Sequence, residues 1–135
     1  MPEATPFGVL AGVHVLLVED EPDSRELLKA AMEYAGALVT EASSARAAVS
    51  VLRSITPDVL VSDIVMAHED GFWLLREVRA LERGARIPAV AVTALGGAAD
   101  RRRIVEAGFQ AQLTKPVDPW ELCAIVAGLA RRAGP

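Results

Sequence analysis

The sequence predicts an α/β fold in which strands and helices alternate along the chain in a (βα)5 pattern. The five strands are expected to form one parallel, doubly wound sheet. Three observations predict it. Apolar runs of strand length alternate with amphipathic segments along the chain. The apolar runs are continuous rather than alternating, which is typical of strands covered on both faces. The connections are short, which favours right-handed crossovers between parallel strands.

The chain of 135 residues fits one domain with a single core. Prolines and glycines interrupt residues 1–12, which we predict to be a lead-in. We expect the domain to span residues 13–132 and a short tail to cover residues 133–135.

The first predicted strand is the β-branched, apolar run 13–18. Acidic residues stop it, and Pro22 stands at a favourable first position of the helix that follows. Gly36 can end that helix. Residues 37–42 then form a second strand, which we expect at an edge of the sheet.

The middle of the chain repeats the same strand and helix pattern. Either Ser43 or Ser44 can cap a helix that extends to Leu52. Residues 58–63 form the third strand. Asp70 caps the third helix, whose apolar stripe ends at Leu81.

The last third completes the five units. Residues 87–94 form the fourth strand, and residues 98–108 form a short helix that ends at a glycine. Residues 110–114 form the fifth strand. Asp118 begins the last helix with proline at its first position, and the buried stripe of this helix extends to Leu129.

The composition excludes several classes of protein. A net charge of −4 argues against nucleic-acid binding, and no apolar stretch approaches the roughly 20 residues that a bilayer requires. The first twelve residues have no basic region and no long apolar run, so they do not read as a signal peptide. The lone cysteine, Cys123, suits a reducing cytoplasm.

Charged and polar side chains stand where four of the predicted strands end. They are Glu19 and Asp20, then Asp63, then Thr93, then Lys115. Parallel strands bring their carboxyl ends to one edge of the sheet, so we expect these groups to converge there. Clustered carboxylates repel unless a cation enters, and the set suits Mg²⁺. A metal, a lysine and a hydroxyl around one carboxylate favour phosphoryl transfer, with the carboxylate as nucleophile.

Four motifs, in this order, carry a resemblance to a known family. They are "LLVEDE" (16–21), "DIVMAHEDG" (63–71), "AVTA" (91–94) and "AGFQAQLTKPVDPWEL" (107–122). With them the chain resembles the receiver domains of two-component response regulators, including chemotaxis regulators, over residues 13 to 132. The resemblance implies a flavodoxin-like three-layer sandwich with strand order 2-1-3-4-5. Receivers are a standard example of that order, so it is carried over from the family and does not follow from the apolar patterning.

The resemblance also implies roles for the acids. Asp63 would accept a phosphoryl group from the phosphohistidine of a histidine kinase or a phosphotransfer protein. Mg²⁺ would be bound by Asp20 and Asp63 directly, by Glu19 through water and by the Val65 carbonyl. The chain would be a phosphoacceptor in a cytoplasmic phosphorelay and not an enzyme.

Other residues would carry the signal by the same resemblance. Thr93 would hydrogen-bond the phosphoryl group, Lys115 would pair with it, and the Lys115–Pro116 peptide bond would be cis. Phosphorylation would then change a partner-binding face made by the fourth helix, fifth strand and fifth helix. The sequence leaves open whether the domain forms a homodimer.

The chain departs from the family pattern in one loop and at Gln112, and two further positions bear on loss of the phosphoryl group. Met66-Ala67-His68 replaces Met-Pro-Gly, so we expect a less rigid loop. Gln112 occupies the position of the switch aromatic, so the coupling to Thr93 is expected to be weak, differently wired or polar. Val65 and Leu95 occupy positions that tune dephosphorylation, and neither can orient an attacking water, so we predict slow loss of the phosphoryl group.

Three other functions compete with this one. A phosphatase of the haloacid dehalogenase class needs an acid where Val65 stands. A nucleotide or flavin binder needs a glycine-rich turn after the first strand, whereas this chain has Glu19-Asp20-Glu21-Pro22 there, which repels phosphate unless a metal is present. A receiver-like docking module that takes no phosphoryl group stays as the alternative. The chain is expected to be either a single-domain regulator or a receiver taken from a larger protein such as a hybrid kinase.

Overall fold

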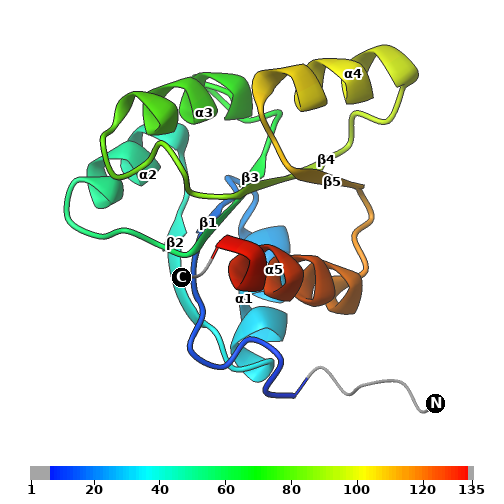
Figure 1. Cartoon of the computed structure of the whole chain (residues 1–135). Coiled ribbons are helices and arrows are strands. Elements are labelled where there is room, and N and C mark those ends of the chain that lie inside the picture. Colours follow the sequence, from blue (N-terminus) through cyan, green and yellow to red (C-terminus); the bar gives the residue numbers. More distant parts are fainter. Residues whose placement is uncertain (1–6, 134–135) are drawn as a thin grey trace.

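A computed structural model describes residues 7–133 of the chain. Over that range, five strands alternate with five helices (Figure 1). The strands are β1 (His14–Val18), β2 (Leu38–Ala42), β3 (Val59–Asp63), β4 (Ala89–Thr93) and β5 (Ala111–Thr114). The helices are α1 (Pro22–Tyr34), α2 (Ala45–Leu52), α3 (Gly71–Ala80), α4 (Ala98–Ala107) and α5 (Pro119–Ala133).

The strands form one parallel sheet in the order β2-β1-β3-β4-β5. This confirms the predicted fold class, the strand order and the edge position of β2. The chain passes from β1 outward to β2 and then back past β1 to β3, so the direction of winding reverses between β1 and β3. Ligands of such sheets bind at the carboxyl ends of the strands beside this reversal.

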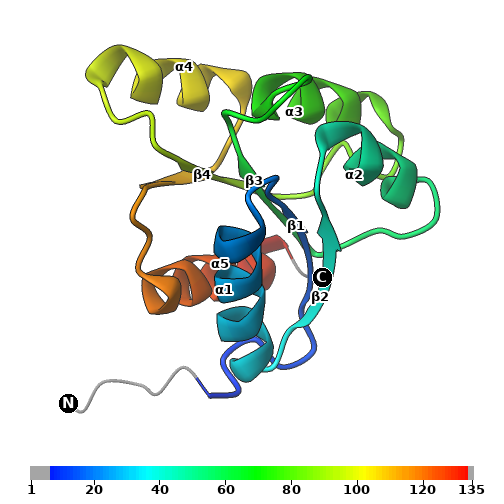
Figure 2. The same cartoon turned by 180° about the vertical axis from the view of Figure 1, so that it is seen from behind.

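The sheet lies between two layers of helices. Helices α1 and α5 cover one face, and α2, α3 and α4 cover the other (Figures 1 and 2). Successive residues of β1 serve opposite layers: Leu16 packs with the α2–α4 side and Leu17 with the α1–α5 side. Because both faces are covered, the central strands are apolar over most of their length, and the buried polar residues Ser62, Asp63 and Thr93 lie at or next to the carboxyl ends of β3 and β4. Each large apolar side chain buried in this way stabilises the fold by roughly 1.5–3 kcal/mol.

The helices begin at the residues that the sequence indicates. Pro22 is the first residue of α1. The Ser44 hydroxyl accepts a hydrogen bond from the Ala47 N–H at 3.1 Å, so Ser44 rather than Ser43 caps α2. The Asp70 carboxylate accepts a hydrogen bond from the Trp73 N–H at 2.9 Å and caps α3, as predicted. Each such cap stabilises its helix by about 1 kcal/mol.

Some element boundaries differ from the prediction. Strand β4 begins at Ala89 instead of residue 87, because Pro88 has no N–H to donate to a ladder. Helix α4 ends as expected, with Gly108 in the left-handed conformation at φ 110°. Leu10, in the predicted lead-in, is fully buried and its N–H donates to the Ala35 carbonyl at 2.8 Å. Residues 1–6 of that lead-in lie outside the described residues, and the domain limits stay a prediction.

Two further features bear on the function classes that the composition excludes. Among residues 7–133, no helix combines the length and the apolarity needed to cross a membrane.

Cys123 is buried in α5 with its thiol 3.8 Å from the Ala31 carbonyl oxygen, and burial raises the pKa of this thiol to about 11. A buried, protonated thiol of this kind is inert packing rather than a redox group.

Candidate functional site

The carboxyl edge of the sheet holds every charged or hydroxyl side chain that was predicted to gather there. Glu19 and Asp20 directly follow β1, Asp63 ends β3, Thr93 ends β4, and Lys115 directly follows β5. Glu19, Asp63 and Thr93 are buried, and Asp20 and Lys115 are half-buried. The edge therefore combines ionisable groups with little solvent around them.

Three carboxylates and one ammonium group form the centre of the site. Carboxylate oxygens of Glu19, Asp20 and Asp63 lie within 4.8 Å of one another. The Lys115 ammonium lies 2.7 Å from Glu19 Oε1 and 2.8 Å from Asp63 Oδ2. Lys115 compensates part of the negative charge, and the remainder favours a bound cation.

Asp63 is the most constrained of the acids. Its Oδ1 accepts hydrogen bonds from the Ile64 N–H at 2.7 Å and the Val65 N–H at 3.2 Å, while Oδ2 accepts from Lys115. Its own carbonyl accepts a hydrogen bond from the Ser62 hydroxyl at 2.8 Å. The backbone therefore fixes the direction in which this carboxylate faces the edge of the sheet.

Burial and charge change the ionisation of two groups in the site. Burial raises the pKa of Glu19, the nearby charge of Asp63 raises it further, and the Lys115 hydrogen bond opposes both. Burial alone would lower the pKa of Lys115, but its hydrogen bonds to Asp63 and Glu19 outweigh burial and raise it. Lys115 therefore stays charged at neutral pH, and Glu19 holds its proton to a higher pH than an exposed glutamate does.

The loop after β3 is hydrogen-bonded to the acidic cluster through Ala67, one of the residues that depart from the family pattern. The Ala67 N–H donates a hydrogen bond to Asp20 Oδ2 at 2.9 Å. A proline at residue 67 would have no N–H to donate. The next residue, His68, is exposed and has φ 65°, which is the left-handed region that favours glycine. The expected lower rigidity of this loop stays a prediction.

Gly71 lets the first turn of α3 approach the end of β3. Its N–H donates to the Ile64 carbonyl at 2.8 Å. A Cβ atom on Gly71 would lie 2.5 Å from the Asp63 carbonyl oxygen and 2.8 Å from Ile64 Cα. Both neighbours are backbone atoms of the site, so any larger residue displaces the segment that carries Asp63.

We expect Gly71→Ala to lower the free energy of unfolding by roughly 1–3 kcal/mol, the usual cost of overpacking. Urea denaturation measures it. Gly128→Ala is the matched control, because the nearest atoms to its added Cβ are in the flexible Arg132 side chain at 3.8 Å. Replacing this helical glycine is expected to stabilise the protein by about 0.4–1 kcal/mol. Equal effects of the two substitutions would contradict the packing described at Gly71.

Thr93 and Gln112 occupy neighbouring strands near the site. The Thr93 hydroxyl accepts a hydrogen bond from the Leu95 N–H at 3.1 Å, and its carbonyl accepts one from the Lys115 N–H at 2.8 Å. Gln112 lies in β5, and its side-chain amide donates to the Arg101 carbonyl of α4 at 3.1 Å. A polar contact thus connects β5 with α4 where the family has an aromatic residue. Val65 is exposed at the rim of the site.

The comparisons with known proteins agree with this geometry. The family model described as the response regulator receiver domain matches residues 15–127. The chain belongs to this family. It is a receiver domain of the kind found in two-component response regulators, and the cis Lys115–Pro116 peptide bond expected from the resemblance is present.

Relatives and solved structures support the assignment. An uncharacterized 14.6 kDa protein of Leptolyngbya boryana is 45% identical over 117 residues, which cover 87% of this chain and 89% of that protein. The response regulator Rre1 of Synechocystis is 38% identical over 89% of this chain, but this chain spans only 52% of Rre1. The receiver domain of the Francisella response regulator 1452 has a TM-score of 0.85, with 26% identity over 91% of this chain and 100% of that one.

One solved relative contains the expected metal. The receiver domain of the sensor histidine kinase PA1611 of Pseudomonas aeruginosa, solved with a magnesium ion in its active-site cleft, has a TM-score of 0.82. It is 32% identical over 90% of this chain and 99% of that one. The oxygen-rich set of Glu19, Asp20 and Asp63 is the type of ligand set that Mg²⁺ prefers, so the residues of this chain fit such an ion.

Proposed function

We propose that this receiver domain accepts a phosphoryl group on Asp63 in a Mg²⁺-dependent reaction. The observation that carries the proposal is the placement of Asp63. It ends a central strand beside the reversal of winding, it contacts Lys115, and its carboxylate lies within 4.8 Å of Glu19 and Asp20. A buried carboxylate with a lysine and two further acids is suited to covalent phosphoryl transfer.

The donor in this proposal is the phosphohistidine of a histidine kinase or of a phosphotransfer protein. An oxygen of Asp63 attacks phosphorus, the bond from phosphorus to the imidazole nitrogen breaks, and the imidazole leaves with the electron pair. The product is an acyl phosphate on Asp63. The backbone N–H groups of Ile64 and Val65 hold the carboxylate in place for this attack.

Asp20, Asp63 and the Val65 carbonyl would hold Mg²⁺ directly, and Glu19 would hold it through water. When bound, the ion neutralises negative charge on the oxygens of the transferred group. Lys115 supplies a second positive charge from the end of β5, and Thr93 supplies a hydroxyl from the end of β4. These groups act by position and charge rather than by covalent chemistry.

The output belongs to the same proposal. Movement of Thr93 toward the phosphoryl group would change the face formed by α4, β5 and α5, which a downstream protein or a second copy of the chain would read. Gln112 already connects β5 to α4 through the Arg101 carbonyl, so the signal would pass through a polar contact. A cytoplasmic location is also proposed, and the lone, buried Cys123 supports it.

Treatment with acetyl phosphate and MgCl₂ tests the proposed function, with intact mass as the readout. We expect the mass of one phosphoryl group to be added, and we expect EDTA to prevent the addition. If no mass is added with or without Mg²⁺, the docking-module alternative is favoured and the proposed chemistry is wrong.

The phosphoryl group is expected to leave slowly once it is bound. Val65 is exposed after β3, and Leu95, two residues after Thr93, packs against the core on the α2–α4 side. Both side chains are apolar, so neither can orient a water for attack on phosphorus. The decay of radiolabelled protein after removal of the donor measures the lifetime. Val65→Asn, which adds a polar group at the rim, is expected to shorten it. A wild-type lifetime of seconds would contradict this prediction.

A further inference from the structure

Arg25, in the first turn of α1, holds the backbone from which two of the acids project. Its Nη1 donates a hydrogen bond to the carbonyl of Glu19 at 2.9 Å. Glu19 follows the last residue of β1, so its carbonyl lies just beyond the β1 strand. A carbonyl left unpaired in so buried a place would cost about 1–3 kcal/mol. Arg25 therefore satisfies a group that the sheet leaves free.

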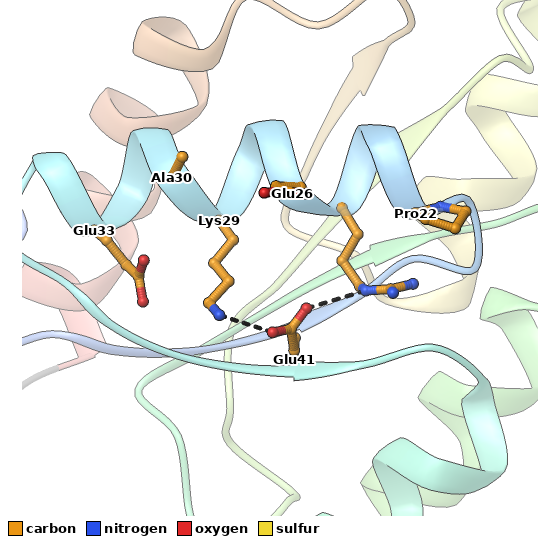
Figure 3. A pocket seen from close by; sticks show the side chains of 7 residues that line it. Pro22, Glu26, Lys29, Ala30, Glu33 and Glu41 are labelled. Atoms are coloured by element: carbon orange, nitrogen blue, oxygen red, sulfur yellow. Dashed lines mark hydrogen bonds and ion pairs between the residues drawn. The ribbon is translucent and has the colours of Figure 1, made fainter.

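Arg25 is itself held by the edge strand. Its Nε lies 3.1 Å from Glu41 Oε1, and Lys29 Nζ lies 2.8 Å from Glu41 Oε2. Figure 3 shows the Glu41 carboxylate in a surface hollow between α1 and β2, with Lys29 reaching it from the next turn of the helix. The hydrogen bond from Lys29 is the main cause that lowers the pKa of Glu41, and the bond from Arg25 adds to it. Glu41 is thus charged at neutral pH and can orient the guanidinium.

The contact bears on the acidic cluster through the main chain. The Glu19 N–H donates to the Ala42 carbonyl at 3.1 Å, and the Glu19 carbonyl accepts from Arg25. The backbone N–H of Glu19 is therefore held by β2, and the backbone carbonyl of Glu19 is held by α1. The carboxylates of Glu19 and Asp20 extend from that segment toward Asp63. A shift of this backbone would move two carboxylates at once.

We propose that Arg25, oriented by Glu41, is a positioning residue for the metal-binding acids of this chain. The inference rests on the proposed function, because it assigns Arg25 a task in the same Mg²⁺ site. Arg25 does not touch the metal in this scheme; it fixes the backbone of Glu19 and Asp20 so that their oxygens meet the geometry that Mg²⁺ demands. Partners that orient metal ligands in this way commonly change metal affinity by about 10–100-fold when they are removed.

The test is the Kd for MgCl₂, measured by isothermal titration calorimetry on the folded wild type and on Arg25→Met. Positioning predicts binding that is roughly tenfold weaker in the variant. The direction in which Kd changes distinguishes positioning from simple electrostatics, because Arg25→Met also removes a positive charge near an acidic site. A purely electrostatic role for Arg25 therefore predicts tighter binding of Mg²⁺. Arg25→Lys keeps the charge but has a single ammonium in place of the two-armed fork, so it is expected to recover only part of the affinity.

Lys29→Met is the matched control. It removes a positive charge from the same helix and one ion pair of Glu41, but it leaves the hydrogen bond from Arg25 to Glu19 in place. We expect its Kd to be unchanged, and urea denaturation without Mg²⁺ verifies that each variant is folded. Unchanged or tighter binding by Arg25→Met would overturn the inference. Absence of binding by the wild type would instead overturn the metal site of the proposed function.

Discussion

Asp63→Asn is expected to abolish the Mg²⁺-dependent addition of a phosphoryl group. The amide has the same size as the carboxylate, and its oxygen can still accept the hydrogen bonds of Ile64 and Val65. The fold is therefore kept. The neutral amide is a far weaker nucleophile, however, and it removes one of the three carboxylates that attract a cation. The weaker nucleophile and the weaker attraction for a cation both oppose transfer of the phosphoryl group.

Intact mass after treatment with acetyl phosphate measures the effect. Asp70→Asn is the matched control, since it makes the same chemical change at the start of the next helix, and asparagine caps helices as well as aspartate does. We expect Asp70→Asn to be phosphorylated like the wild type. Addition of a phosphoryl group to Asp63→Asn at the wild-type level would mean that another residue is the acceptor.

Lys115→Met is expected to cause the largest loss of stability among the site variants. The side chains of Glu19 and Asp63 are 1% and 7% exposed, and Lys115 is their shared cation. Without it, two buried carboxylates face each other with no compensating charge. Breaking a buried pair commonly costs about 3–5 kcal/mol, and we expect about 3 kcal/mol because Lys115 is itself partly exposed. Urea denaturation in the absence of Mg²⁺ measures the difference.

The loss should depend on pH in a defined direction. The pKa of Glu19 is raised in the folded protein above its ordinary value of 4.5, so its protonation favours the folded state. That contribution is fully present below the unfolded pKa and is lost as pH rises through the folded pKa. Lys115→Met removes the hydrogen bond that opposes this rise, so Glu19 of the variant takes up its proton at a higher pH than in the wild type. The deficit of Lys115→Met should therefore shrink as pH falls from neutral and Glu19 is protonated.

A double variant isolates the cause of the destabilisation. Glu19→Gln is expected to recover part of the stability lost in Lys115→Met, because it removes one of the two charges left without a partner. The same substitution in the wild type removes a paired charge and is not expected to stabilise as much. A Lys115→Met variant as stable as the wild type at neutral pH would contradict the electrostatic account of the site.

Much of the fold follows from short-range patterns in the sequence. Continuous apolar runs predict strands covered on both faces, and caps such as Asp70 predict where helices begin. The strand order was predicted on another basis, because it follows from the resemblance of the motifs to a family and not from periodicity. An apolar run alone also overestimates the length of β4, because Pro88 extends the run but cannot donate to the ladder.

The gathering of the acids was predictable because parallel strands bring their carboxyl ends together. Contacts between residues on different elements could not be predicted in this way. The contact of Arg25 with Glu41 was not predicted, because Glu41 lies sixteen residues further along the chain, on another element. The hydrogen bond from Ala67 to Asp20 joins residues forty-seven apart and involves only a backbone N–H, which no side-chain pattern reveals. The absence of proline at residue 67 is the one signal that pointed to this position.

Reductive trapping of the phosphorylated protein tests the central claim most directly. Borohydride reduces an aspartyl phosphate to homoserine, and peptide mass spectrometry locates the altered residue. After treatment with acetyl phosphate and MgCl₂, the structure predicts homoserine at residue 63 and at no other aspartate. Homoserine at another position, or none at all in a protein whose mass shows an added phosphoryl group, would contradict the assignment of Asp63 as the acceptor.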